Sequence, residues 1–159
     1  MKDSSNFSAA ERVESLKAGS VAALSCLLGF GAIALGNSLI LADRLDSLAN
    51  LQVREIDLNF AFRGTIALLG GFLFGVTYRY AIRRDVNPQL KSGAVLAFGL
   101  VRAFGQLDSG LFFDAGKMPA LQELLPFAVR GVESVVLFAI AGLVLDWAIG
   151  RSWIKPFDS

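Results

Sequence analysis

The sequence predicts an all-α membrane protein with four transmembrane helices, built from two tandem two-helix repeats in parallel orientation. Three observations lead to this prediction. First, the 159 residues are 54% hydrophobic and only 18% charged, with a mean hydropathy of +0.55, which is too apolar for a soluble domain of this length. Second, the chain contains four apolar runs of about 20 residues, the length at which a helix crosses a hydrocarbon core. Third, the second half of the chain partly repeats the first half.

The composition also excludes several classes of protein. The net charge is +1, so the basic surplus that attracts nucleic acid is missing. The chain has no histidine and a single cysteine, Cys26, so zinc fingers, histidine-ligated haem, and catalysis by Ser-His-Asp or Cys-His groups each lack a required residue. We therefore expect neither an enzyme nor a metal site.

The four apolar runs define the expected spans, which are approximately Ala18–Leu41, Phe60–Ile82, Ser92–Phe113 and Pro126–Ile149. Residues 1–17 form a polar, partly acidic segment before the first run, unlike the short basic start of a secretory signal, so the first run is interpreted as a retained span. The transmembrane domain is expected over residues 18–150, followed by a tail over residues 151–159. Between the first two spans, Asp43–Asn59 is interpreted either as a short surface helix or as a solvated loop.

Basic residues predict the orientation of the helices. They gather before the first span, between the second and third, and after the fourth; they are Lys2, Arg12, Lys17, Arg83, Arg84, Lys91, Arg151 and Lys155. By the positive-inside rule both termini are cytoplasmic, or stromal in a thylakoid. Arg83, Arg84 and Lys91 form a basic corner that would face cytosolic partners or anionic lipid.

An internal duplication relates the two halves. Residues 16–21 (LKAGSV) realign with residues 90–95 (LKSGAV), and residues 60–64 (FAFRG) realign with residues 127–131 (FAVRG). The repeats cover residues 16–84 and 90–151. Because each repeat has two spans, both copies cross the membrane in the same sense, related by a pseudo-twofold axis along the membrane normal.

The polar residues inside the spans are the candidate site, because charges near the bilayer centre are costly and need a reason. Arg102 and Glu133 are expected at similar depth and are predicted to pair, with Gln106 and Arg130 nearby. One interpretation is an anion, proton or lipid-headgroup site. The other is an ion pair that fixes helix register.

Two further pairs follow from the repeat. Arg63 and Arg130 occupy the same place in the FAxRG element; they either snorkel toward headgroups or form a pseudo-symmetric pair that caps the outer loops or holds an acidic lipid. Arg79 and Asp146 are also equivalent, near the inner face, and have opposite charges. These two residues are predicted to pair between the second and fourth spans.

Two stretches suggest a family. FAFRGTIALLGGFLFGVTYRYAIRRDVNPQLKSGAVLAFGLVRAFGQLD and FAVRGVESVVLF resemble an uncharacterised family of small membrane proteins of cyanobacteria and plastids. The resemblance implies a thylakoid or related membrane and association with a photosynthetic or respiratory complex, and it assigns no functional residues. The lack of histidine disfavours pigment binding, and no cofactor is predicted, although a bound lipid is compatible with the sequence.

These observations predict a protein that acts through contacts, as a small subunit, assembly factor or scaffold of a larger membrane complex in a thylakoid or plasma membrane. Its partners would be membrane lipids and other membrane-protein subunits, or further copies of itself. The alternative is a small homo-oligomeric transporter or channel subunit in which Arg102, Arg130 and Glu133 line the path of a substrate or ion.

Overall fold

The computed structural model describes residues 9–41, 57–83, 87–110 and 121–157, and within these ranges the chain is all-helical without strands. The helices are α1 (Ala9–Gly36), a short π-helical segment η1 (Asn37–Leu41), α2 (Leu58–Ile82), α3 (Pro88–Gly110) and α4 (Leu121–Gly150). An all-helical fold is therefore confirmed. The predicted surface segment Asp43–Asn59 lies outside the described residues except for its last three.

The ends of α2 and the start of α3 follow local signals. Asp57 caps α2, because its side chain accepts a 2.8 Å hydrogen bond from the amide of Phe60. At the other end, Arg83 has a φ of 47° and donates its amide to the carbonyl of Arg79, which closes the last turn. Pro88 stands at the first position of α3, where its missing N–H is not needed.

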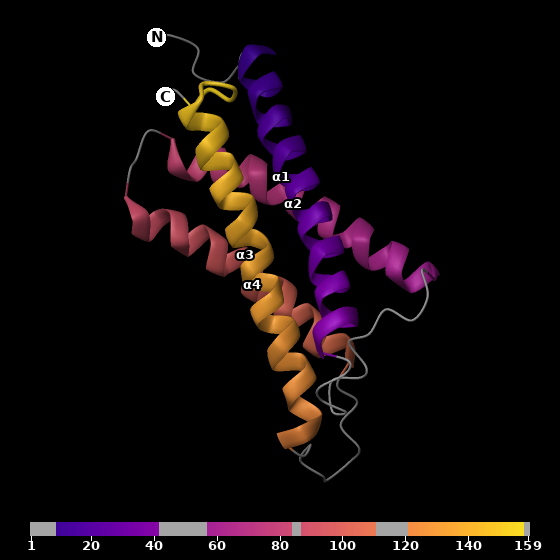
Figure 1. Cartoon of the computed structure of the whole chain (residues 1–159). Helices are drawn as coiled ribbons and strands as arrows, with labels where there is room; N and C mark the ends of the chain where they lie inside the picture. Colours follow the sequence, from indigo (N-terminus) through magenta and orange to yellow (C-terminus); the bar gives the residue numbers. More distant parts are fainter. Residues whose placement is uncertain (1–8, 42–56, 84–86, 111–120, 158–159) are drawn as a thin grey trace.

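The helices pack as two hairpins joined mainly through α1 and α4. α1 packs most extensively against α2, and α3 against α4, whereas the contact between α2 and α3 is sparse. Figure 1 shows the start of α1 and the end of α4 close together at one end of the molecule. We call this the terminal end and the opposite one, where α1 finishes and α4 begins, the distal end.

Glycines bring the paired helices close. A Cβ added at Gly71 would lie 2.8 Å from the carbonyl oxygen of Ala22, and one added at Gly75 would collide with the backbone of Ala18. In the second hairpin, a Cβ on Gly99 would lie 2.8 Å from the Cα atom of Val135. Both hairpins therefore rest on backbone approaches that only glycine permits.

An aromatic cluster fills the middle of the bundle. The ring centroid of Phe74 lies 5.1 Å from that of Tyr78, 5.4 Å from that of Phe98 and 5.3 Å from that of Phe138. These rings come from α2, α3 and α4, and they close the space between the helices at mid-height.

The outer surface of the helices is apolar, with Leu28, Val101 and Leu143 each more than 70% exposed. Three segments, Ala9–Leu39, Leu58–Ile82 and Leu124–Gly150, are long and apolar enough to cross a membrane. α3 is not among them, because Lys91, Arg102 and Asp108 fall within its 23 residues. A membrane protein is thus supported, with three candidate spans.

Candidate functional site

A polar cavity lies at the distal end, between all the helices. Five of the predicted site residues line it, namely Arg63, Arg102, Gln106, Arg130 and Glu133. The remaining lining residues are Phe30, Ile33, Ala34, Asn37, Phe60, Ser134 and Leu137. Its water-accessible volume is about 40 Å³, which suffices for roughly three waters at ~10–15 Å³ each. We call it the arginine cavity.

The arginine cavity is electrostatically positive. Its described lining has three guanidinium groups, from Arg63 on α2, Arg102 on α3 and Arg130 on α4, and one carboxylate, that of Glu133. The repeat-equivalent residues Arg63 and Arg130 thus share one cavity, although they belong to different hairpins. Three cations so close together favour an anion among them.

The carboxylate of Glu133 has a different partner from the one expected. Its Oε1 atom accepts a 2.7 Å hydrogen bond from Nδ2 of Asn37, and among the described contacts it forms no ion pair with Arg102. Glu133 and Arg102 do not pair because their side chains border different grooves. Glu133 also borders the α1–α4 groove beside Ile33 and Val132, whereas Arg102 borders the groove between α2 and α3.

A second set of hydrogen bonds ties α3 to α4 at the cavity wall. Gln106 Nε2 donates to Oγ of Ser134 at 2.9 Å, and that hydroxyl donates to the carbonyl of Arg130 at 2.8 Å. Ser134 is 3% exposed. Asn37 and Ser134 are cavity residues that sequence reasoning missed. The signal that could have found them is a polar side chain in an apolar run, as it is for Gln106.

An apolar groove continues from the arginine cavity along the sparse contact between α2 and α3. We call it the α2–α3 groove; its volume is about 660 Å³. Its polar end is formed by Arg63, Arg102, Gln106 and Arg130, and its apolar part by Ile66, Gly70, Leu73, Phe98, Val101, Gly105 and Phe138. Gly105 contributes open space, because an added Cβ there would meet nothing within 4 Å.

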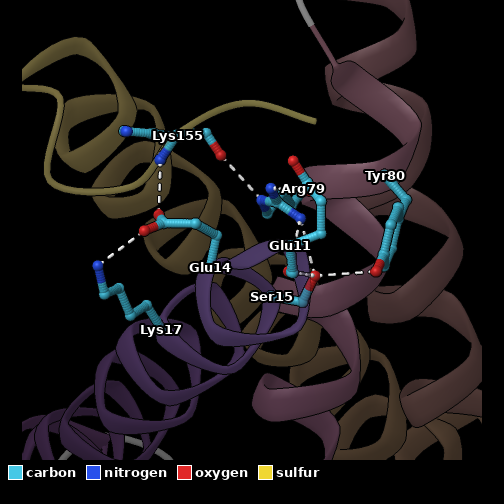
Figure 2. Close-up of polar contacts among 7 residues, drawn as sticks. All are labelled: Glu11, Glu14, Ser15, Lys17, Arg79, Tyr80 and Lys155. Carbon is cyan, nitrogen blue, oxygen red and sulfur yellow. Dashed lines mark hydrogen bonds and ion pairs between the residues drawn. The ribbon is translucent and has the colours of Figure 1, made fainter. Parts of the chain in front are cut away.

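The terminal end holds a different kind of arginine site, shown in Figure 2. The side chain of Arg79 is fully buried and forms an ion pair with Glu11. It also donates to Oγ of Ser15 at 2.8 Å and to the carbonyl oxygen of Lys155 at 2.8 Å. The hydroxyls of Ser15 and Tyr80 share a hydrogen bond of 2.9 Å. This Arg79 cluster joins α1, α2 and the segment after α4.

The predicted pair between Arg79 and Asp146 is therefore wrong. Asp146 accepts instead from Lys91 Nζ at 2.9 Å and from the Tyr78 hydroxyl at 3.1 Å. Successive helix residues point about 100° apart, so Tyr78 reaches α4 while Arg79 turns toward α1. Both residues lie at the expected end of the bundle, but they face different neighbours.

The basic corner is partly engaged within the protein. Lys91 forms the ion pair with Asp146, and the Arg83 guanidinium lies 5.6 Å from the ring centroid of Phe157. Arg84 lies outside the described residues.

Comparisons with protein-family models, with curated proteins and with solved structures give no match to this chain.

Proposed function

We propose that this chain is a four-span membrane protein that acts through contacts, as a small subunit, assembly factor or scaffold of a larger membrane complex. The observation that carries the proposal is a set of glycines that the bundle itself does not use. An added Cβ at Gly31, Gly36 or Gly93 would meet nothing within 4 Å. Unlike Gly71 and Gly75, these positions leave smooth outer faces on which a partner helix can pack closely.

The fourth crossing is supported by the position of the chain ends. Oε2 of Glu14, near the start of α1, accepts a 2.8 Å hydrogen bond from the amide of Lys155, beyond α4. The two ends therefore lie on one side of the bundle, which requires an even number of crossings. With α1, α2 and α4 long enough to span, this position of the chain ends favours α3 as the fourth crossing. Two of its charged residues have polar surroundings, since Arg102 lines the arginine cavity and Lys91 pairs with Asp146.

We further propose that both termini are cytoplasmic or stromal, in a thylakoid or plasma membrane, with a photosynthetic or respiratory complex as the partner. Arg83, Lys91, Arg151 and Lys155 at the terminal end support this orientation. The two closely packed hairpins, and the shared cavity of Arg63 and Arg130, support the internal duplication.

The test is purification of the C-terminally tagged chain from its native membrane in mild detergent, followed by a native gel and mass spectrometry. We expect co-migration with a larger complex at fixed stoichiometry. Gly31→Leu should abolish that co-migration without unfolding the bundle, whereas Leu28→Ile, one turn away and 74% exposed, is the matched control. Migration of the wild-type chain as a small homo-oligomer with lipid alone would overturn the proposal.

The second candidate is a small transporter or channel subunit, which the positive charge of the arginine cavity favours. The cluster of Phe74, Phe98 and Phe138 opposes it, because these rings close the bundle below the cavity. Anion flux into vesicles containing the purified chain, abolished by Arg102→Gln, would establish this candidate in place of the first.

A further inference from the structure

We propose that the arginine cavity and the α2–α3 groove together bind one membrane lipid with an anionic headgroup. The headgroup oxyanion would lie among Arg63, Arg102 and Arg130, and one acyl chain would lie along the groove. This inference goes beyond the proposed function, because it concerns a ligand of the bundle itself and holds whether or not the chain joins a complex.

Two arginine environments in the same chain differ in the acceptors that surround them. Arg79 is enclosed by acceptors that the protein supplies, namely Glu11, Ser15 and the carbonyl of Lys155. Arg63 and Arg102, by contrast, form no hydrogen bond or ion pair with their side chains in the described part of the chain. A guanidinium has five N–H donors and is not deprotonated in proteins. Lipid tails offer these donors no acceptor.

The charge of the cavity indicates which kind of acceptor the side chains of Arg63 and Arg102 would bind. Among the described residues that line the cavity, the single carboxylate is that of Glu133, which is already hydrogen-bonded to Asn37. The described lining therefore has a surplus of positive charge. Guanidinium groups match the planar pairs of oxygens on phosphate, sulfonate and carboxylate groups. The missing partner is therefore an oxyanion, which three helices approach from different sides.

The shape of the groove shows what else the ligand carries. From Ile66 to Leu73 the groove follows α2 for about 10 Å at ~1.5 Å per residue, and Gly105 leaves open space along it. A free inorganic anion would need only the polar end. A partner helix with an apolar face would fill the apolar part of the groove but offer no acceptor to Arg102. An amphiphile with a charged head and an acyl chain satisfies both parts at once.

The site also lies at a suitable depth. Arg63 is five residues from the start of α2, and Arg102 is eight residues from the end of α3, or about 8 Å and 12 Å at ~1.5 Å per residue. A headgroup at the distal surface therefore lies within reach of both guanidinium groups. The groove then leads toward the middle of the membrane, as the acyl chain of a lipid in that leaflet does.

The experiment is native mass spectrometry of the full chain after extraction in a neutral detergent and removal of co-purified lipid. Phosphatidylglycerol, phosphatidylcholine with the same acyl chains, and inorganic phosphate are each added back. We expect one phosphatidylglycerol per chain, bound at least tenfold more tightly than phosphatidylcholine, and no retention of inorganic phosphate. Equal binding of the two lipids would overturn the proposal, as would a chain dimer whose formation excludes lipid.

Variants separate the two parts of the site. Arg102→Gln should weaken phosphatidylglycerol binding at least tenfold, Arg102→Lys should restore part of it, and Arg151→Gln, an exposed arginine at the terminal end, should leave it unchanged. Gly105→Leu fills the groove and should weaken lipid binding while the helical circular dichroism is retained. Arg63→Gln, on an exposed side chain, tests the headgroup contact should Arg102→Gln not fold.

Two outcomes refute the interpretation directly. Retention of inorganic phosphate as tightly as phosphatidylglycerol, unaffected by Gly105→Leu, would show a free-anion site. Equal weakening by Arg102→Gln and Arg151→Gln would show attraction by net charge rather than a site.

Discussion

Replacement of Arg79 by methionine should strongly destabilise the bundle. Methionine keeps the unbranched stem but removes the guanidinium, which has no exposed surface. Glu11, the Ser15 hydroxyl and the Lys155 carbonyl then lose their common donor. Removal of one partner of a buried ion pair costs about 3–5 kcal/mol. Because the Glu11 side chain is 25% exposed and solvent relieves part of that cost, we expect about 3 kcal/mol.

The assay is thermal unfolding of the purified chain in a neutral detergent, followed by circular dichroism. For a chain of this size about 3 kcal/mol corresponds to a fall in Tm of roughly 6–12 °C. Glu11→Gln should cost less, about 1 kcal/mol, because a neutral acceptor replaces a charged one. In the double variant Arg79→Met/Glu11→Gln, the losses should not add, since both substitutions break the same contact.

The matched control is Arg12→Met, the same substitution at an exposed arginine beside Glu11, which should change the free energy of unfolding by less than about 0.5 kcal/mol. Equal losses for Arg79→Met and Arg12→Met would refute the reasoning. Additive losses in the double variant would show that Arg79 and Glu11 stabilise the bundle independently.

Three further predictions concern two contacts between helices and the cap of α2. Gly75→Leu should destabilise the bundle by about 1–3 kcal/mol or more through overpacking against Ala18, measured by the same unfolding assay; a loss no larger than that of Gly31→Leu would contradict the close approach. Ser134→Ala should cost about 1 kcal/mol, because Gln106 loses its acceptor across α3 and α4; an unchanged Tm would contradict the role of that bond. The amide of Phe60 holds the pKa of Asp57 below its ordinary value of 3.8, so the cap stabilises the start of α2 above the unfolded pKa and is lost as pH falls through the lower, folded one. The protection factor of the Phe60 amide, which is its intrinsic exchange rate divided by its observed rate at the same pH, should therefore fall in acid in the wild type and stay constant in Asp57→Asn. Equal behaviour of the two proteins would contradict the cap.

The helices themselves could be predicted from the sequence because they follow from long apolar runs. The second run, predicted over Phe60–Ile82, forms a helix over Leu58–Ile82. The first helix begins at Ala9, nine residues before the expected span. Polar side chains in that first part, Glu11 and Ser15 among them, favour a separate polar segment by composition, but they bind Arg79 inside the bundle, so the helix continues through them.

That the charged residues Arg102 and Glu133 share a cavity is predictable from the sequence, and their hydrogen-bond partners are not. An ionisable residue in an apolar run faces the bundle interior rather than lipid, which places Arg102 and Glu133 in one cavity. Which acceptor meets which donor depends on the rotation of each helix about its axis. The same limit explains Arg79, whose position near the inner face follows from the sequence while its partner, 68 residues away on α1, does not.

The two arginine sites, at opposite ends of the bundle, differ in the acceptors that the described part of the chain supplies to them. At the terminal end the chain supplies acceptors from α1 and from the segment after α4, so Arg79 closes the contact between the two chain ends. At the distal end three helices bring arginines together, and the only carboxylate lining their cavity in the described part of the chain is bonded to Asn37. Within the described residues, the side chains of Arg63 and Arg102 form no hydrogen bond or ion pair, whereas Arg79 meets three acceptors of the chain. The proposed anionic lipid would supply to Arg63 and Arg102 the acceptors that the chain itself supplies to Arg79.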